Sequence, residues 1–151
     1  MKHSARMSNA LDLNELAKVS RLFEALDAHG RNALLSLSHR VPHGPGEVVC
    51  REGEPGGEFW VIASGEVRVS AQALDGEKEI ARLGHGQFFG EMAALNGDRR
   101  TATCTAVTDV ELVAFPSQSV EQILSQYPAA RETLHKVGLL RSEDTMQKMM
   151  E

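Results

Sequence analysis

The sequence is poor in cysteine and aromatic residues, and it has no long apolar run. Its two cysteines are too few for the disulfide framework of a small secreted domain. We expect Cys50 and Cys104, which lie in apolar, strand-like stretches, to be reduced and buried, as in a cytoplasmic protein, with a disulfide between them as the less favoured alternative. No apolar stretch approaches the roughly 18 residues of a membrane-spanning helix. The N-terminus also lacks the apolar core of a signal peptide.

Basic residues are also fewer than acidic ones. Sixteen Lys and Arg residues stand against 21 Asp and Glu residues, which gives a formal charge of −5. A nucleic-acid-binding protein normally carries a basic face, so we expect no nucleic-acid partner. The length of 151 residues is typical of one domain, and a hydrophobic content of 42% is enough for a core.

The N-terminal part of the chain has apolar residues at helical spacing. We expect a helical extension over residues 1–19 and a second helix that is capped by Asp27 and weakened by Gly30. The apolar positions of the two helices are Leu11, Leu16, Val19, Leu22, Phe23 and Leu26, followed by Leu34, Leu35 and Leu37.

Residues 41–115 have a different pattern, in which short strand-like runs alternate with turns. The Asp75-Gly76 pair is a strong indication of a tight hairpin. Many short strands at near-regular spacing are typical of an antiparallel barrel or roll. The predicted strands are Glu47–Arg51, Glu58–Ala63, Glu66–Ala73, Lys78–Leu83, Thr101–Val107 and Val110–Phe115.

Helical spacing returns after residue 116. We expect Ser117 to cap one helix and Pro128 to lie in the first turn of a final one, with residues 146–151 as a tail. The whole order predicts a mainly β fold with flanking helices (α+β). The apolar positions of these helices are Val120, Ile123, Leu124, Leu134, Val137 and Leu140.

The segment 88–103 reads Phe-Phe-Gly-Glu-Met-Ala-Ala-Leu-Asn-Gly-Asp-Arg-Arg-Thr-Ala-Thr. Glu91 follows Gly90 at the head of a short apolar stretch, and Arg100 follows nine residues later. A carboxylate and an arginine so arranged suit a ligand with a sugar hydroxyl at one end and a phosphate at the other. The segment resembles the phosphate-binding cassette of cyclic-nucleotide-binding domains.

Weaker motifs agree with the same family in order along the chain. They are Gly-Glu at 46–47, Glu-Gly-Glu-Pro-Gly at 52–56 and Ser-Gly-Glu-Val at 64–67. The resemblance implies a domain over residues 20–145, with a jelly-roll-like antiparallel β-roll (a double-stranded β-helix) at 41–115 and a lid of C-terminal helices at 117–145. It also implies a regulatory domain without catalytic activity, with cAMP or cGMP as its ligand and no cofactor.

The resemblance assigns roles to individual residues. Arg100 takes the phosphate, because its guanidinium is a planar fork with a permanent charge. Glu91 takes the ribose 2′-hydroxyl, because an ionised carboxylate accepts hydrogen bonds only. Backbone amides at the start of a short helix expected over Glu91–Leu95, and those near Arg100, also face the phosphate. The full set of ligand-binding residues is Phe89, Gly90, Glu91, Met92, Ala93, Arg100, Thr101 and Ala102, with Arg141 from the lid.

Two further residues bear on the base of the nucleotide. In the family, a threonine at the position of Thr101 can form a hydrogen bond with a guanine amino group, and it is associated with cGMP preference, although cAMP binders also have it. We expect cAMP, on the basis of ligand availability in bacteria-like signalling systems. Arg141 can stack on the purine, with Leu139 and Leu140 as apolar alternatives. Arg99 is expected to be exposed.

Two other classes of protein remain open. One is a β-roll interaction module that binds no nucleotide. The other is a cupin-type metal enzyme, which is disfavoured because none of the six histidines forms a His-x-His pair and Pro42 lies between His39 and His43. Too few residues follow Arg141 for a helix-turn-helix. The effector is therefore expected elsewhere, and the C-terminal helix is a candidate for homodimer contacts.

Overall fold

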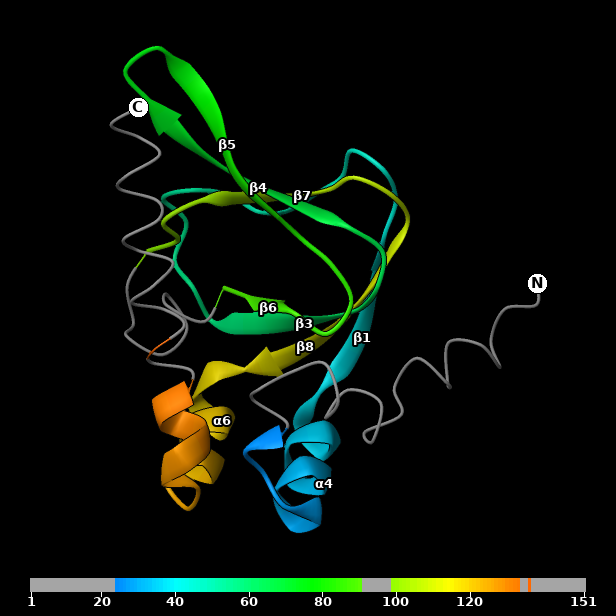
Figure 1. Ribbon diagram of the computed structural model, residues 1–151, viewed down its shortest axis with the longest axis vertical. Helices are drawn as coiled ribbons and strands as arrows, with labels where there is room; N and C mark the ends of the chain where they lie inside the picture. The colour runs from blue at the N-terminus through cyan, green and yellow to red at the C-terminus, as the bar shows by residue number, and fades with distance from the viewer. Residues whose placement is uncertain (1–23, 91–98, 134–135, 137–151) are drawn as a thin grey trace, which may run out of the picture.

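Two antiparallel four-stranded sheets form a roll, and the helices lie together at one end of it (Figure 1). A computed structural model of the protein describes residues 24–90, 99–133 and 136. One sheet has the order β1-β8-β3-β6 and the other β2-β7-β4-β5. The strands are β1 (His39–His43), β2 (Val48–Cys50), β3 (Glu58–Ser64), β4 (Val67–Ala73), β5 (Gly76–Leu83), β6 (Phe88–Phe89), β7 (Thr103–Ala106) and β8 (Val110–Pro116).

The predicted mainly β fold with flanking helices is confirmed. All six predicted strands are present, as β2, β3, β4, β5, β7 and β8, and their ends differ from the predictions by two residues at most. The Asp75-Gly76 hairpin is also present, because Ala73 pairs with Gly76 at the end of β4 and β5. Gly76 has a φ of 116°, a value that residues with a side chain rarely adopt.

Two strands were not predicted. β1 pairs with β8 over the whole of His39–His43, although helical spacing was expected to continue to residue 40. Its Pro42 cannot donate to a ladder, but β1 is an edge strand, where proline is tolerated. β6 has only two residues, Phe88 and Phe89, and pairs with the middle of β3.

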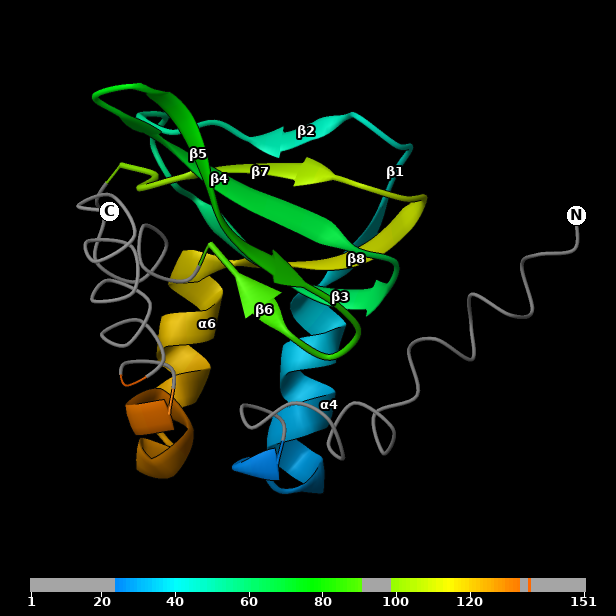
Figure 2. The same cartoon turned by 45° about the horizontal axis from the view of Figure 1, so that its top comes forward.

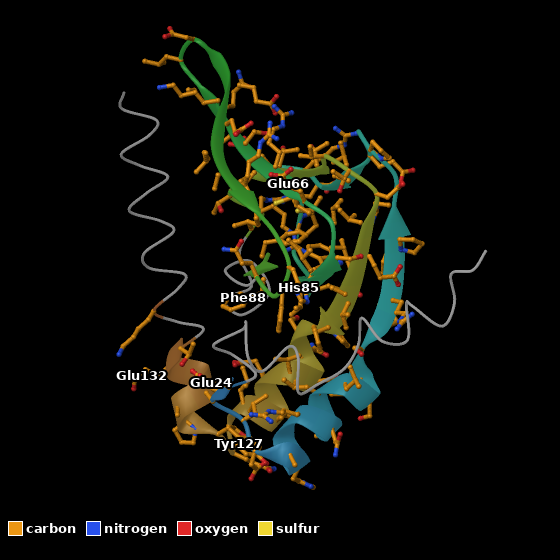
Figure 3. The ribbon with its side chains drawn as sticks, turned by 45° about the vertical axis from the view of Figure 1, so that its right-hand side comes forward. Glu24, Glu66, His85, Phe88, Tyr127 and Glu132 are labelled. Atoms are coloured by element: carbon orange, nitrogen blue, oxygen red, sulfur yellow. The ribbon has the colours of Figure 1, made fainter. Side chains whose placement is uncertain are left out.

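The first described helix, α4 (Ala28–Leu37), has the predicted cap. The Asp27 carboxylate accepts a hydrogen bond from the Gly30 N–H at 2.8 Å. A Cβ atom on Gly30 would lie 2.8 Å from the Tyr127 ring, so close helix packing explains a glycine inside this helix. Tyr127 lies among the helices, at the opposite end of the molecule from the β4–β5 hairpin (Figure 3).

The second helix, α6 (Ser117–Leu124), differs from the prediction at its start. Pro116 occupies the N-cap position and no side chain caps the helix, so the assignment of Ser117 as the cap is wrong. A further helical segment covers residues 128–133, and it begins at Pro128 as predicted. Residues 1–23, and the C-terminal predictions beyond residue 136, lie outside the described residues.

Two cores lie on opposite sides of the β1-β8-β3-β6 sheet. Along β3, Phe59 and Val61 face the helices, whereas Trp60 and Ile62 face the interior of the roll. Burying each such side chain contributes about 1.5–3 kcal/mol. The interior core of the roll contains Cys50, Trp60, Ile62, Val67, Leu83, Phe89, Cys104, Ala106, Val110, Leu112 and Ala114.

Candidate functional site

Arg100 is one of two buried charged residues of the described structure, the other being Glu111, and it lies next to the interior core of the roll. It retains only 7% of its exposed surface. Its Nη1 donates to the Gly90 carbonyl at 2.9 Å, and its Nη2 donates to the Glu58 carbonyl at 2.8 Å. Its Cζ lies 4.7 Å from the centre of the Trp60 ring, within the range of a cation–π contact. Backbone oxygens and an aromatic face thus fix the guanidinium.

The backbone of Arg100 is also held on both sides. Its N–H donates to the Glu54 carbonyl at 2.7 Å, and its carbonyl accepts from the Gly53 N–H at 2.9 Å. Next to it, Arg99 is exposed and donates from Nη1 to the Gly53 carbonyl at 2.9 Å. The turn before β3 therefore positions the segment that leads into β7.

Gly90 and Phe89 complete the surroundings of the guanidinium. Gly90 has a φ of 84°, and a Cβ atom there would lie 2.8 Å from Arg100 Nη1 and 2.9 Å from Trp60 Cζ3. Phe89 is buried and stacks on Trp60 with 5.2 Å between ring centres. Only glycine fits between the arginine and the indole without displacing one of them.

The charge of Arg100 has no ion-pair partner in the part of the chain that the structure describes. Two guanidinium N–H groups are used by carbonyls, and the others have no acceptor among residues 24–90, 99–133 and 136. A buried charge is costly unless it is paired. An anion that offers two oxygens would meet the remaining donors with directed hydrogen bonds.

The structure brings together several of the predicted site residues. Phe89, Gly90 and Arg100 lie together around Trp60. Thr101 is exposed and Ala102 is half-buried, directly after Arg100 in the chain. The remaining predicted site residues, which are Glu91, Met92, Ala93 and Arg141, lie outside the described residues.

Three contributors to the site were missed from the sequence. Trp60 was assigned only to a predicted strand, although it is the one tryptophan of the chain. Glu54 and Glu58 act through their backbone carbonyls, and a carbonyl leaves no trace in the choice of side chain. The only indication of these contributors in the sequence was a single tryptophan, Trp60, within an apolar strand.

The other polar clusters do not form a metal site. Within the described residues, no group of three or more His, Cys, Asp or Glu side chains is arranged to hold a metal ion. His39 instead lies 3.5 Å from Glu58, and His43 lies 3.7 Å from Glu47, both near the surface. None of the described helices is long and apolar enough to cross a membrane.

A family model described as "Cyclic nucleotide-binding domain" matches residues 40–127. The chain belongs to this family. The match begins in β1 and ends just after α6, so it includes the turn at Gly53 and Glu54, the indole of Trp60 and the buried Arg100. The predicted family is confirmed.

Curated relatives of the chain include cyclic nucleotide-gated channels. The chain is 30% identical over 140 residues to cyclic nucleotide-gated channel alpha-4 of Mus musculus, a match that covers 89% of the chain and 24% of the channel. It is 38% identical over 96 residues to a cyclic nucleotide-gated potassium channel of Rhizobium etli, covering 64% of the chain and 26% of the channel.

The fold also matches solved structures. The catabolite activator protein of Thermus thermophilus superposes with a TM-score of 0.75 at 29% identity, over 86% of this chain and 62% of that one. The chain spans about a quarter of the length of the curated relatives named above. The similarity thus concerns one part of each of those proteins.

Proposed function

We propose that this chain binds a cyclic nucleotide at Arg100 and acts as a regulatory domain. The observation that carries the proposal is a buried guanidinium that two backbone carbonyls and the Trp60 ring hold in place, without an ion pair to a described carboxylate. A cyclic nucleotide has one negative charge shared by two exocyclic phosphate oxygens. Those two oxygens match the planar fork of N–H donors of an arginine. A lysine has the charge but not the fork.

The sugar and the base are assigned on the family resemblance. Glu91 is proposed to accept a hydrogen bond from the ribose 2′-hydroxyl. Amides after Gly90, and those of Thr101 and Ala102, assist at the phosphate. Met92 and Ala93 follow in the same segment. Arg141 is proposed to stack on the base. A 2′-deoxy analogue should bind less tightly than the parent nucleotide, because Glu91 would lose its donor.

Calorimetry on nucleotide-free protein tests the proposal. Wild-type protein should release or absorb heat with cAMP, and Arg100→Lys should weaken binding by about tenfold or more, since charge-assisted hydrogen bonds contribute about 1.5–3 kcal/mol each. Arg99→Lys is the matched control. It changes the neighbouring, exposed arginine in the same way and should leave the affinity nearly unchanged.

Two results would contradict the proposal. Absence of heat with both cAMP and cGMP in folded, nucleotide-free protein would favour an interaction module that only retains the fold. Equal losses in Arg100→Lys and Arg99→Lys would show that general positive charge, and not the buried fork, governs binding. Urea unfolding of each variant confirms that it is folded.

Thr101 bears on the choice between the two nucleotides but does not decide it, because cAMP binders of the family also have a threonine there. We propose cAMP as the preferred ligand, with cGMP as the alternative. If the Thr101 hydroxyl contributes to guanine recognition, Thr101→Ala should lower cGMP affinity and leave cAMP affinity nearly unchanged. Parallel titrations with the two nucleotides measure this ratio. A wild-type protein that binds cGMP more tightly than cAMP would reverse the preference.

The regulatory step is proposed to be a shift between two arrangements of the C-terminal helices. Ligand binding favours a closed arrangement only as far as its affinities for the two states differ, and complete switching needs a difference of about 10⁴-fold. The effector is a separate protein or a further part of a longer chain, and a homodimer through the C-terminal helix is part of this proposal. We place the domain in the cytoplasm, without catalytic activity of its own.

A further inference from the structure

The two cysteines of the chain lie directly opposite each other on neighbouring strands. Cys50 on β2 is the register partner of Cys104 on β7. The two strands lie side by side (Figure 2). The register of β2 and β7 shifts between Val48 and Cys50, so the cysteine pair adjoins an irregularity of the ladder. Opposed residues of an antiparallel pair have Cα atoms about 4.5–5.5 Å apart, which lies within the range of about 4.4–6.8 Å that a disulfide requires. Both are free thiols, as expected from the sequence.

The two side chains also share the same surroundings. Both belong to the interior core of the roll, with 6% of Cys50 and 4% of Cys104 exposed. The Cys104 thiol forms a hydrogen bond with the Cys50 sulfur, and this bond lowers the pKa of the Cys50 thiol. The charge of Arg100 lowers that pKa further, while burial and Glu54 oppose the effect.

The backbone connects this pair to the phosphate site. Cys104 follows Arg100 by four residues, and Cys50 precedes the turn that contains Gly53 and Glu54. That turn holds the Arg100 backbone through both of its hydrogen bonds. The two thiols therefore lie on the two strands that meet at the nucleotide site.

We propose that Cys50 and Cys104 form a redox-sensitive dithiol that a peroxide converts to an intrachain disulfide, and that nucleotide at Arg100 slows this conversion. The first half of the proposal stands on the facing thiols alone. The second half rests on the proposed function, because it needs an anion at Arg100. A bound phosphate would offset the guanidinium charge that favours the reactive thiolate.

The reaction needs one peroxide per chain. The Cys50 thiolate attacks one peroxide oxygen, the O–O bond breaks, and the leaving alkoxide or hydroxide takes up a proton, so that Cys50 becomes a sulfenic acid. The Cys104 sulfur then attacks the Cys50 sulfur, the S–O bond breaks, and hydroxide leaves with the Cys104 proton as water. Two thiols are oxidised, the peroxide is reduced, and an added thiol restores the dithiol.

To test the dithiol, the reduced 151-residue protein is treated with hydrogen peroxide, and its mass is followed by mass spectrometry under non-reducing conditions. We expect a loss of two hydrogens per chain, a cross-linked peptide pair containing Cys50 and Cys104, and reversal by dithiothreitol. Cys104→Ala should instead stop at a Cys50 sulfenic acid that a dimedone probe captures. Wild-type protein is sufficient for the decision if that variant does not fold.

Three outcomes would overturn the dithiol. They are two unmodified thiols under conditions that oxidise free cysteine completely, disulfides between chains, and oxidation of each cysteine beyond the sulfenic acid without a cross-link. These measurements are made without nucleotide, so they stay informative even if calorimetry detects no binding. The dithiol and the proposed function can therefore fail separately.

The coupling to the site is tested in nucleotide-free protein by removing the charge. Arg100→Gln should slow disulfide formation several-fold, whereas Arg99→Gln should not, because only the Arg100 guanidinium lies against the interior core. If calorimetry has shown binding, saturating nucleotide should slow wild-type oxidation by a similar factor. Equal rates in Arg100→Gln and wild-type protein, or equal rates with and without saturating nucleotide, would overturn the coupling.

Discussion

At the scale of single residues, the site depends on how a buried cation is held before any ligand arrives. Arg100 lies between the carbonyls of Gly90 and Glu58 and over the ring of Trp60. These neighbours fix the orientation of the fork but do not neutralise it. The ordering of a long side chain is therefore complete in advance, which lowers the entropy lost on binding.

Gly90 offers a direct test of this arrangement. Gly90→Ala should weaken nucleotide binding and destabilise the fold by about 1 kcal/mol or more, because its left-handed φ and its contacts with Arg100 and Trp60 both exclude a Cβ atom. Gly46→Ala is the matched control, since Gly46 has a φ of 85° but nothing within 4 Å of the added atom. The Gly46→Ala variant should be less stable than wild type because of backbone strain, and it should bind nucleotide with unchanged affinity. Calorimetry and urea unfolding measure the two effects.

Trp60 makes the site visible in solution. It is the only tryptophan, and its ring lies 4.7 Å from the Arg100 guanidinium carbon. Nucleotide binding should therefore change the intensity or wavelength of tryptophan emission in wild-type protein. The change should be absent in Arg100→Gln and retained in Arg99→Gln. An unchanged spectrum at saturating nucleotide would mean that the ligand does not reach this arginine.

At the scale of secondary-structure elements, Asp27 joins two helical segments. Its carboxylate accepts from the Gly30 N–H, as the cap of α4, and from the Tyr127 hydroxyl at 3.0 Å. Tyr127 lies in the segment between α6 and the helical residues 128–133. The exposed side chain of Asp27 thus holds the start of α4 against the connection between α6 and the helical residues 128–133.

The same carboxylate predicts a dependence of stability on pH. The backbone hydrogen bond from Gly30, and then the bond from Tyr127, lower the pKa of Asp27 below its ordinary value of 3.8. A lowered pKa stabilises the folded state above the ordinary value, and this stabilisation is lost as pH falls through the folded-state pKa. Wild-type protein should exceed Asp27→Asn in free energy of unfolding at pH 6, and the difference should shrink below pH 3.8.

Urea unfolding over this pH range measures the effect. Asp75→Asn is the control, because Asp75 is an exposed residue of the β4–β5 loop that makes no hydrogen bond to a described residue. The difference in free energy of unfolding between Asp75→Asn and wild type should stay constant over this pH range. A constant difference for Asp27→Asn as well would show that the cap does not depend on ionisation.

The elements differ in how far the sequence predicted them, for physical reasons. Strands with β-branched and aromatic runs between turns were found, including β3 and β8. β1 was missed because His39–His43 contains a proline and has no alternation, and its place follows only from pairing with β8. β6 was missed because two phenylalanines in a row do not distinguish a strand from the approach to the short helix predicted after Gly90.

The candidate site was predictable to the extent that side chains carry it. Arg100 and Gly90 belong to a recognisable motif, and the structure brings them together. The carbonyls of Glu54 and Glu58 come from a turn and a strand that are distant in sequence, so only the fold reveals them. The facing of Cys50 and Cys104 likewise depends on strand register, which composition does not determine.

At the scale of the whole molecule, ligand binding should stabilise the domain by mass action. Nucleotide at about 100 times its dissociation constant adds about 2.7 kcal/mol, which corresponds to a rise of about 5–10 °C in Tm for a chain of this size. Thermal unfolding with and without cAMP measures the shift. Arg100→Lys should show a much smaller rise at the same concentration, and Arg99→Lys should match wild type.

β3 carries alternate side chains into each of the two cores, so its sheet lies between the interior core of the roll and the helical end of the molecule. Trp60 contacts Arg100 on one side, and its neighbours Phe59 and Val61 contact the packing of α4 and α6 on the other. A single sheet lies between the two cores. A displacement of side chains on one face of that sheet is transmitted to the other face, because close-packed interiors have low compressibility. If nucleotide binding at Arg100 shifts the indole, we expect the helices packed on Phe59 and Val61 to repack.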